Sequence, residues 1–520
     1  MDGESLLDFF SPAVKPLTRK RQAMNDTLDL ALDKPSLMLD ANCIAGEWQP
    51  ALSGQRYPVV NPATGEAFAT VADSGVDDAA AALDAASAAF PAWRDTSARE
   101  RATFLKAWHR KLLDHSEDLA RLMSREQGKP LPEARGEVAY GAAYVEWFAE
   151  EAVRAYGDIL PTLLPGRKQM AVKEPVGVVA AITPWNFPLA MLARKLAPAL
   201  AAGCTVVAKP AEDTPLTALA LVKLAQDAGI PAGVLNIVTA SRSNTAPTVA
   251  YWLKDARVRK VSFTGSTAVG KYLARESADT LKKLSLELGG NAPFIVFEDA
   301  DLDAAVEGLI AAKFRNSGQT CVCPNRVYVH QAVHDDFAVR LALRVAALRV
   351  GPATHAASDL GPLINGRAVE KVERHVRDAL AKGGRIMTGG EPLRDSVADG
   401  PFYYSPTVIA NASADMALHD EETFGPVVPL FSFANEQEAV ALANDTPFGL
   451  AAYFYTRNLP RSWRIARQLE AGIIGINEGR ISSEAAPFGG IKESGYGREG
   501  SRYGLDDYMQ IKYLCLGGME

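Results

Sequence analysis

Two cysteines, Cys321 and Cys323, stand one residue apart in the segment FRNSGQTCVCPNR, directly after a Gly-Gln-Thr turn. The chain of 520 residues has only five cysteines, so the close spacing of two of them needs an explanation. A thiolate can attack a carbonyl carbon, and two neighbouring thiols can close a disulfide. A free cysteine is more often a small buried hydrophobe. A zinc site is disfavoured, because the other cysteines and the seven scattered histidines supply no second ligand pair.

A carboxylate and an amide elsewhere in the chain have the chemistry to serve such a thiol. In KLSLELGG the leucines share one face of an expected strand, so Glu287 lies on the other face. A carboxylate there is costly unless it is used or paired, which leaves a general base or a salt bridge. In ITPWNFP, Pro184 and Pro188 bracket a rigid turn that projects Asn186. Its amide suits a developing oxyanion, although asparagine is also a routine turn residue.

A phosphate-binding position is indicated by KVSFTGSTAVGKYL. The pattern places Gly265 and Ser266 at the end of a strand and opens a helix at once, so free backbone N–H groups face the space above the sheet. The same letters nearly match a P-loop, but Tyr272 replaces the Ser or Thr that would hold magnesium. A nucleoside triphosphate-binding protein is therefore a weaker alternative, and a tight turn built from small residues is the ordinary one.

The segment TVVAKPAEDTP supplies a second strand end, with Lys209 closing the strand and Glu212 shortly after it. A lysine there can hold ribose hydroxyls or a phosphate. A carboxylate accepts hydrogen bonds from a ribose diol and repels a 2′-phosphate, which predicts NAD over NADP. The alternative is that Glu212 only stabilises the first turn of a helix.

The helices and strands that must position these residues are predicted by the alternation of helical and strand patterns along the chain. Residues 77–157 are helical in periodicity, and short β-branched runs separated by helical stretches begin at Val176. A second alternation begins at residue 294. The fold class expected is α/β: a doubly wound parallel-sheet cofactor domain, a second α/β catalytic domain and a small β arm. The expected division is a disordered tail (1–27), an NAD-binding domain (28–159 and 176–288), a catalytic domain (289–496) and an oligomerisation arm (160–175 and 497–520).

Composition narrows the class of protein. A net charge of −7 argues against a general nucleic-acid binder, and no run of 18 or more apolar residues is long enough to span a membrane. The few cysteines and the absence of a secretory signal pattern predict a reducing compartment, which we take to be the cytoplasm. At 48% hydrophobic residues, the chain can bury two or three domains.

Seven segments together resemble the signatures of the NAD(P)-dependent aldehyde dehydrogenase superfamily, in order and over nearly the whole chain from about Cys43. They are ITPWNFP, AKPAEDTP, SFTGSTAVGK, LELGGNAP, FRNSGQTCVC, EETFGPVV and PFGGIKESGYGREG. Within it, FRNSGQTCVC and the ISS before PFGG are most similar to the succinate-semialdehyde dehydrogenases.

The resemblance implies a reaction and a role for each residue. Cys321 attacks the aldehyde to give a thiohemiacetal, whose oxyanion is held by Asn186 and the Cys321 N–H. Hydride leaves for the nicotinamide ring of NAD (NADP is also possible), and Glu287 activates the water that hydrolyses the resulting thioester. The resemblance also implies that the cofactor is held by Trp185, Lys209, Glu212, Gly265, Ser266, Glu422 and Phe424, and that no metal is needed.

Substrate recognition is implied less directly. In the resembling subfamily, Arg and Ser hold a carboxylate at the far end of the substrate, and Arg194, Arg315 and Ser482 occupy the matching places. Arg194 has an alternative, which is to pair with an acidic neighbour. GRISS places Arg480 where an aliphatic residue is expected, which favours a longer or more acidic semialdehyde, such as glutarate semialdehyde, or a side chain that points to solvent.

Three further expectations concern Cys323, the β arm and the class of protein. Cys323 is a possible redox partner of Cys321, in a strained disulfide that is easily reduced, or else it packs beneath the loop. The arm is expected to complete a neighbour's sheet and give a homodimer or homotetramer. A non-catalytic thiol or scaffold protein on the same fold is the remaining class.

Overall fold

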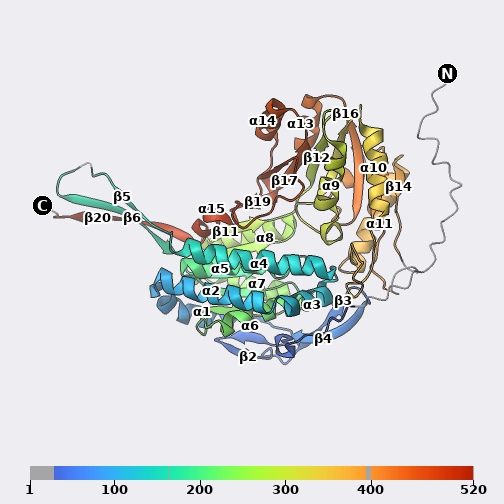
Figure 1. Cartoon of the computed structure of the whole chain (residues 1–520). Coiled ribbons are helices and arrows are strands. Elements are labelled where there is room, and N and C mark those ends of the chain that lie inside the picture. The colour runs from blue at the N-terminus through green and yellow to red at the C-terminus, as the bar shows by residue number, and fades with distance from the viewer. Residues whose placement is uncertain (1–27, 163, 394–399, 519–520) are drawn as a thin grey trace, which may run out of the picture.

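The computed structural model describes residues 28–162, 164–393 and 400–518, and the tail predicted for residues 1–27 lies outside them. Two large sheets carry helices on their faces, and a thin three-stranded arm projects away from the body (Figure 1). The expected fold class is confirmed. None of the helices in the described ranges combines the length and the hydrophobicity needed to cross a bilayer.

The N-terminal part contains strands that the sequence patterns did not reveal. They are β1 (Asn42–Ile44), β2 (Glu47–Gln49), β3 (Arg56–Asn61) and β4 (Glu66–Ala72), preceded by the 3₁₀ turn η2 (Pro35–Leu37). The predicted helical layer follows as α1 (Val76–Asp95), α2 (Ala98–Asp114), α3 (Ser116–Gln127) and α4 (Leu131–Ala152). Ser97 begins α2 with a capping box, in which its Oγ accepts the Glu100 N–H and the Glu100 carboxylate accepts the Ser97 N–H.

The first large sheet has the strand order β19-β11-β10-β7-β8-β9-β1-β2. Its parallel centre consists of β7 (Val178–Ile182), β8 (Thr205–Lys209), β9 (Leu235–Ile237), β10 (Val258–Thr264) and β11 (Lys283–Glu287). The connecting helices are α5 (Ala190–Ala202), α6 (Pro215–Asp227), α7 (Arg242–Lys254) and α8 (Thr267–Ser277), with η3 (Ala278–Thr280) after α8. The chain runs from β7 toward β8 and β9 on one side and places β10 and β11 on the other, so the winding reverses between β7 and β10.

The second large sheet has the order β14-β15-β16-β13-β12-β17-β18. Its strands are β12 (Ala292–Val296), β13 (Pro324–His330), β14 (Arg385–Thr388), β15 (Thr407–Ala410), β16 (Val427–Phe433), β17 (Ala451–Tyr455) and β18 (Ile473–Ile476). All pairs are parallel except β14 with β15. Its helices are α9 (Leu302–Lys313), α10 (His334–Ala346), α11 (Gly366–Ala381), α12 (Ala417–Asp420), α13 (Glu436–Asn444) and α14 (Leu459–Gln468).

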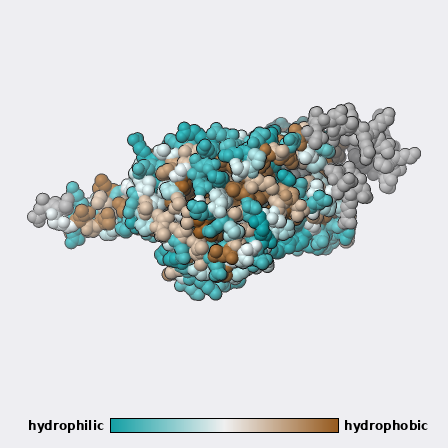
Figure 2. Space-filling view, turned by 90° about the horizontal axis from the view of Figure 1, so that it is seen from below, coloured by the Kyte–Doolittle hydropathy of each residue, from teal (hydrophilic) through white to brown (hydrophobic). Residues whose placement is uncertain are grey.

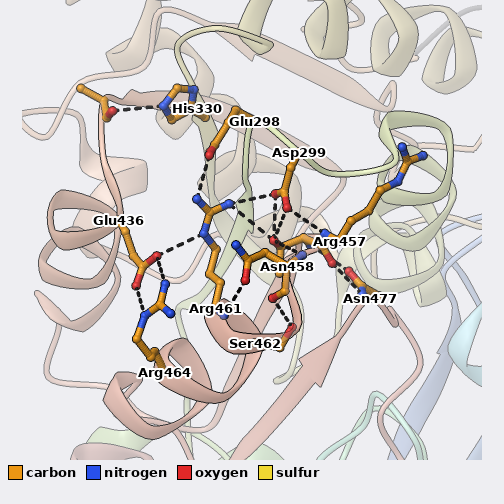
Figure 3. A network of polar contacts seen from close by, with 12 residues as sticks. Glu298, Asp299, His330, Glu436, Arg457, Asn458, Arg461, Ser462, Arg464 and Asn477 are labelled. Carbon is orange, nitrogen blue, oxygen red and sulfur yellow. Dashed lines mark hydrogen bonds and ion pairs between the residues drawn. The ribbon is translucent and has the colours of Figure 1, made fainter.

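The winding of the second sheet reverses between β12 and β17, and side chains fill the space beyond their carboxyl ends (Figure 3). The Arg461 guanidinium donates to Glu298, Asp299 and Glu436 and lies 4.5 Å from the Phe297 ring centroid. A ligand of a doubly wound sheet is expected at this reversal. In the second sheet that position is occupied by the protein itself.

The arm is a sheet of three strands, β5 (Asp158–Leu160), β6 (Arg167–Pro175) and β20 (Met509–Gly517), in the order β20-β6-β5. The hairpin and the C-terminal strand expected from the sequence are both present. Between the second sheet and the arm, η5 (Lys492–Ser494) leads into β19 (Gly495–Tyr496), which pairs with β11. The following helix α15 (Ser501–Asp506) packs on α4 and α5, so this stretch returns to the first sheet before the arm begins.

Candidate active site

Cys321 is half-buried between two cavities. Its own side chain lines a cavity of about 330 Å³ beyond the first sheet. Its neighbours Thr320 and Val322 line a second cavity of about 510 Å³. A thiol in this position can contact two different ligands, one from each side.

The loop that carries Cys321 has an unusual backbone. Asn316, Ser317 and Gly318, in the short turn η4 (Arg315–Gly318), all have positive φ, at 51°, 56° and 76°. For the first two this conformation is strained, and such strain persists only when surrounding contacts hold it. At Gly318 a Cβ would lie 2.2 Å from the Gly425 carbonyl oxygen, so the loop needs glycine there.

The contacts that hold this loop come from the helical layer and from the loop before α11. Both Glu133 carboxylate oxygens lie within hydrogen-bond distance of the Asn316 N–H, at 2.9 and 3.1 Å. The Ser317 hydroxyl donates to the Gly361 carbonyl oxygen at 2.8 Å. The Gln319 side chain accepts the Ile364 N–H at 3.0 Å. Because these partners come from distant parts of the chain, the position of Cys321 depends on the assembled fold.

Asn186 lies beside the same loop, at the end of β7. Its amide nitrogen donates to the Gln319 carbonyl oxygen at 3.0 Å, which fixes the side chain and leaves one amide N–H for another acceptor. The Asn186 carbonyl oxygen accepts from the Asn316 side chain and from Lys129. Asn186 lines the cavity that holds Cys321, so its amide is placed to meet an oxygen formed there.

The environment of Cys321 disfavours its thiolate. The pKa of the thiol is raised to about 12, mainly by burial; the charges of Glu287 and Glu422 contribute to the rise, and Arg194 opposes it. The thiol is therefore protonated at neutral pH. Its attack on a carbonyl therefore requires that the proton leave first.

Glu287 ends β11 and is almost fully buried. Neither of its carboxylate oxygens has a hydrogen-bond partner among the described residues. Burial and the neighbouring Glu499 raise its pKa well above the usual value, while Arg194 and Lys195 oppose the shift. Glu287 does not line either cavity in this structure, although the next residue, Leu288, does. A carboxylate with no hydrogen bond to break can turn toward Cys321 at little cost.

Behind Glu287 lies a buried ion triad, of which the sequence anticipated only that Arg194 could pair with an acidic residue. Glu499 pairs with both Arg194 and Lys195, and all three side chains are at most 2% exposed. The partners are about 300 positions apart in the chain, so no local pattern signals the contact. The triad supplies the charges that bias Glu287, which gives it a direct effect on the site.

The cavity of about 330 Å³ lies where the winding of the first sheet reverses, beyond the ends of β7 and β10. Gly265 and Ser266 line it, and Ser266 begins α8 as its N-cap. Thr264 also lines the cavity, and its buried hydroxyl has no partner among the described residues. A helix N-terminus and an unpartnered hydroxyl at this position fit the pyrophosphate of a dinucleotide.

Lys209 and Glu212 follow the neighbouring strand β8. Their charged atoms lie 3.8 Å apart, with Lys209 buried and about a third of the Glu212 side chain exposed. Ile182 at the end of β7 pairs in register with Lys209, so the pair lies at the strand end next to that of β7, although neither Lys209 nor Glu212 lines the cavity. A carboxylate here can accept a ribose diol and repel a 2′-phosphate.

The opposite wall comes from the second domain. Glu422 and Phe424 line the cavity, and the Phe424 ring meets Trp185 edge to face at 5.6 Å between centroids. Burial raises the pKa of Glu422 to about 7. Arg367 and Lys371 of α11 also line the cavity, and no sequence signal pointed to them. The structure thus brings the expected cofactor residues around one cavity and the adjoining strand end.

The cavity of about 510 Å³ brings together Arg315, Ser482 and Arg480. The Arg315 guanidinium lies 4.7 Å from the ring centroid of Phe187, the residue that follows Asn186 in the chain. Arg194 differs from the expectation. It does not line this cavity, because it is buried, paired with Glu499 and stacked on Phe488 at 4.5 Å. The alternative of an acidic partner describes Arg194 better than a role in substrate binding.

Cys323 is fully buried, and its Sγ donates to the Lys313 carbonyl oxygen at 3.3 Å. Both cysteines are free thiols, so a disulfide would require the loop to rearrange. We expect mild peroxide to inactivate the enzyme and dithiothreitol to restore activity if Cys323 protects Cys321. In Cys323→Ser the oxidised Cys321 lacks a partner and proceeds to the irreversible sulfinic acid, so activity should not return. Recovery of Cys323→Ser equal to that of the wild type would leave Cys323 as a packing residue only.

Comparison with known proteins shows the family of this chain. Residues 48–514 match the model of the aldehyde dehydrogenase family. A glutarate-semialdehyde dehydrogenase of Pseudomonas putida is 53% identical over 91% of this chain and 97% of its own length. A succinate-semialdehyde dehydrogenase [NADP(+)] of Escherichia coli is 52% identical over 94% of this chain and all of its own.

Solved structures give the same result. The structure of a succinate-semialdehyde dehydrogenase from Burkholderia pseudomallei has a TM-score of 0.91 at 55% identity, covering 94% of this chain and 100% of that one. A betaine aldehyde dehydrogenase from Staphylococcus aureus in complex with NAD⁺ has a TM-score of 0.89 at 35% identity, covering 92% and 95%. With its half-buried thiol set between a dinucleotide-type cavity and a second cavity that contains arginine, this chain belongs to the aldehyde dehydrogenase family.

Proposed function

We propose that this enzyme oxidises a carboxylate-bearing semialdehyde to the corresponding dicarboxylic acid, with succinate semialdehyde as the leading substrate and glutarate semialdehyde as the alternative. One observation carries the proposal: Cys321 separates a cavity at the sheet reversal from a cavity lined by Arg315 and Ser482. A guanidinium group recognises a carboxylate through paired hydrogen bonds. The alternative is supported by the glutarate-semialdehyde dehydrogenase relative.

The chemistry follows from the residues around the thiol. The Cys321 thiol gives up its proton to solvent water, its sulfur adds to the aldehyde carbon, and the free Asn186 amide N–H with the Cys321 N–H stabilises the oxyanion that forms. Bound NAD supplies the acceptor for the hydride that leaves the thiohemiacetal carbon. Glu287, whose oxygens are unpartnered, takes a proton from the water that hydrolyses the thioester. The acid is released and the thiol is regenerated.

The cofactor preference is proposed to be NAD over NADP. Glu212 carries the argument, because its partly exposed carboxylate follows β8, the strand next to β7, where it would face a 2′-phosphate. Trp185, Phe424 and Glu422 would hold the nicotinamide end, and Lys209, Gly265 and Ser266 the adenosine ribose and the pyrophosphate.

A panel of aldehydes tests the proposed function. Succinate, glutarate and malonate semialdehydes, betaine aldehyde and acetaldehyde are each assayed with NAD and with NADP. We expect the highest kcat/KM for succinate or glutarate semialdehyde with NAD. A higher kcat/KM for betaine aldehyde or acetaldehyde would overturn the carboxylate assignment, and higher activity with NADP would overturn the role given to Glu212.

The apolar arm supports an oligomer. Brown apolar side chains gather on the projecting arm (Figure 2), and Ile159, Ile511 and Tyr513 are 85%, 74% and 54% exposed. Unpaired apolar strands need a partner. We therefore predict that light scattering at micromolar concentration gives the mass of a dimer or a tetramer, and that replacing Ile159 and Ile511 by Lys shifts the mass toward the monomer. A wild-type protein that is only monomeric would refute the prediction.

Two further assignments stay proposals. The division into an NAD-binding domain, a catalytic domain and an arm is supported by the three sheets. It would be tested by limited proteolysis, with a cut expected near the exposed Leu160 in the arm. A cytoplasmic location is supported by the five free cysteines, and fractionation of cells would test it.

A further inference from the structure

We propose that Arg480 forms a second acid-binding position in the substrate cavity. It would take the carboxylate of five- and six-carbon ω-oxo acids, while Arg315 and Ser482 take that of a four-carbon chain. The inference rests on the proposed function and adds to it a residue that sets chain length.

The size of the cavity leaves room for more than one chain length. At about 510 Å³ it extends from Thr320 and Val322, next to the reacting thiol, to the exposed Arg480. Cavities of this size hold ligands much larger than a four-carbon acid. A short semialdehyde that reaches Cys321 would leave the outer part of the cavity to water.

The two arginines lie at different depths. Arg315 is half-buried, belongs to the loop that carries Cys321 and stacks on Phe187. Arg480 is exposed and comes from a separate loop that follows β18. A carboxylate near the aldehyde end therefore meets Arg315, and one on a longer chain reaches Arg480.

The charges of the cavity distinguish the two arginines further. Of the acidic residues in its wall, Asp359 pairs with Arg349 at 2.9 Å, and Glu133 accepts the Asn316 N–H. The Glu133 charge interacts with that of Arg315. In the part of the chain that the structure describes, the Arg480 guanidinium has no ion pair or hydrogen bond. The Arg315 guanidinium likewise has none among the described residues, so the two arginines differ in depth, in the Phe187 ring that Arg315 packs on and in the Glu133 charge that acts on Arg315.

The backbone beside Arg480 is held in place. A Cβ on the preceding Gly479 would lie 2.1 Å from the Gly308 carbonyl oxygen, so the loop lies directly against α9. The Arg480 N–H donates to the Glu478 carboxylate at 2.7 Å. A fixed backbone with a free guanidinium lowers the entropic cost of binding an anion.

Chain-length kinetics test the proposal. kcat/KM is measured for succinate, glutarate and adipate semialdehydes with the wild type, Arg480→Gln and Arg315→Gln. The matched control is Arg467→Gln, which removes an exposed charge from α14. We expect Arg480→Gln to lower the glutarate-to-succinate and adipate-to-succinate ratios about tenfold, mainly through KM, since one charge-assisted hydrogen-bonded contact is lost. Arg315→Gln should act most on succinate semialdehyde, and Arg467→Gln should leave every ratio unchanged.

The outcomes separate this inference from the proposed function. Equal loss at all three lengths in Arg480→Gln, or no loss, overturns the second acid-binding position. If Arg467→Gln lowers the adipate-to-succinate ratio of kcat/KM as much as Arg480→Gln does, the second acid-binding position is also overturned, because the effect would then come from the net charge of the protein. If the wild type oxidises acetaldehyde better than all three semialdehydes, the proposed function itself fails.

Discussion

Cys321→Ala is expected to abolish NAD reduction, with a loss in kcat of more than about a thousandfold, because no other group can form the covalent intermediate. The cavity beside Cys321 contains the Asn186 amide but no second thiol, since Cys323 is buried and bonded to the Lys313 carbonyl oxygen. Steady-state NADH production from succinate semialdehyde measures the effect.

The control variant for this experiment is Cys515→Ala. Cys515 is exposed on β20 of the arm, and its removal also deletes one thiol from the chain. We expect Cys515→Ala to keep wild-type activity and Cys321→Ala to keep the wild-type unfolding temperature within a few degrees, since the lost atom faces a cavity. A folded Cys321→Ala protein that retains a tenth or more of the activity would rule out the thiol as nucleophile.

The sequence predicts which residues of this site react better than it predicts the contacts that hold them in place. Asn186 and Glu287 could be named because each stands in a short motif at the end of a strand, and Cys321 because its motif, in the loop before β13, resembles that of the family. The alternation of patterns likewise predicted both parallel sheets. The strands β1 and β2 escaped because each has only three residues, and β3 and β4 because they form a separate two-stranded sheet with no helices alternating between its strands.

The triad of Arg194, Lys195 and Glu499 shows more clearly what cannot be predicted from the sequence. Arg194 alone in an apolar helix can be read either as a substrate ligand or as half of a buried pair, and only the position of Glu499 decides. The positive φ angles of Asn316 and Ser317 were equally invisible, since neither residue type requires them. Both features depend on residues brought together by the final packing, as does the anchoring of the loop by Glu133.

This packing sets how Glu287 behaves. Its carboxylate is buried beside Glu499, and the two cations of the triad are bound to Glu499. The raised pKa of Glu287 keeps a larger fraction protonated at neutral pH than for an ordinary glutamate. A general base must be deprotonated, so hydrolysis of the thioester should speed up as the pH rises through that pKa. The pKa of the Cys321 thiol is raised to about 12, so the rate of its attack on the aldehyde should also increase as the pH rises.

Glu287→Gln is therefore expected to separate the two halves of the reaction. The amide cannot accept a proton from water, so turnover should fall about a hundredfold to a thousandfold, while attack and hydride loss still proceed once. Stopped-flow NADH fluorescence should show a burst of one equivalent per active site and then a slow phase. The slow phase should lose the pH dependence that the wild type owes to Glu287. The control is Glu66→Gln, an exposed change of the same charge on β4, which should behave as the wild type.

The covalent product provides the decisive measurement. If Glu287 serves hydrolysis, the quenched Glu287→Gln enzyme should carry an acyl group on Cys321, seen as a mass increase that hydroxylamine removes and that Cys321→Ala never shows. Unpartnered carboxylate oxygens mean that the amide replaces no existing hydrogen bond, so the fold should tolerate the change. A variant that binds NAD as tightly as the wild type yet gives neither burst nor adduct would place Glu287 at the first step instead, as the base that removes the proton from the thiol.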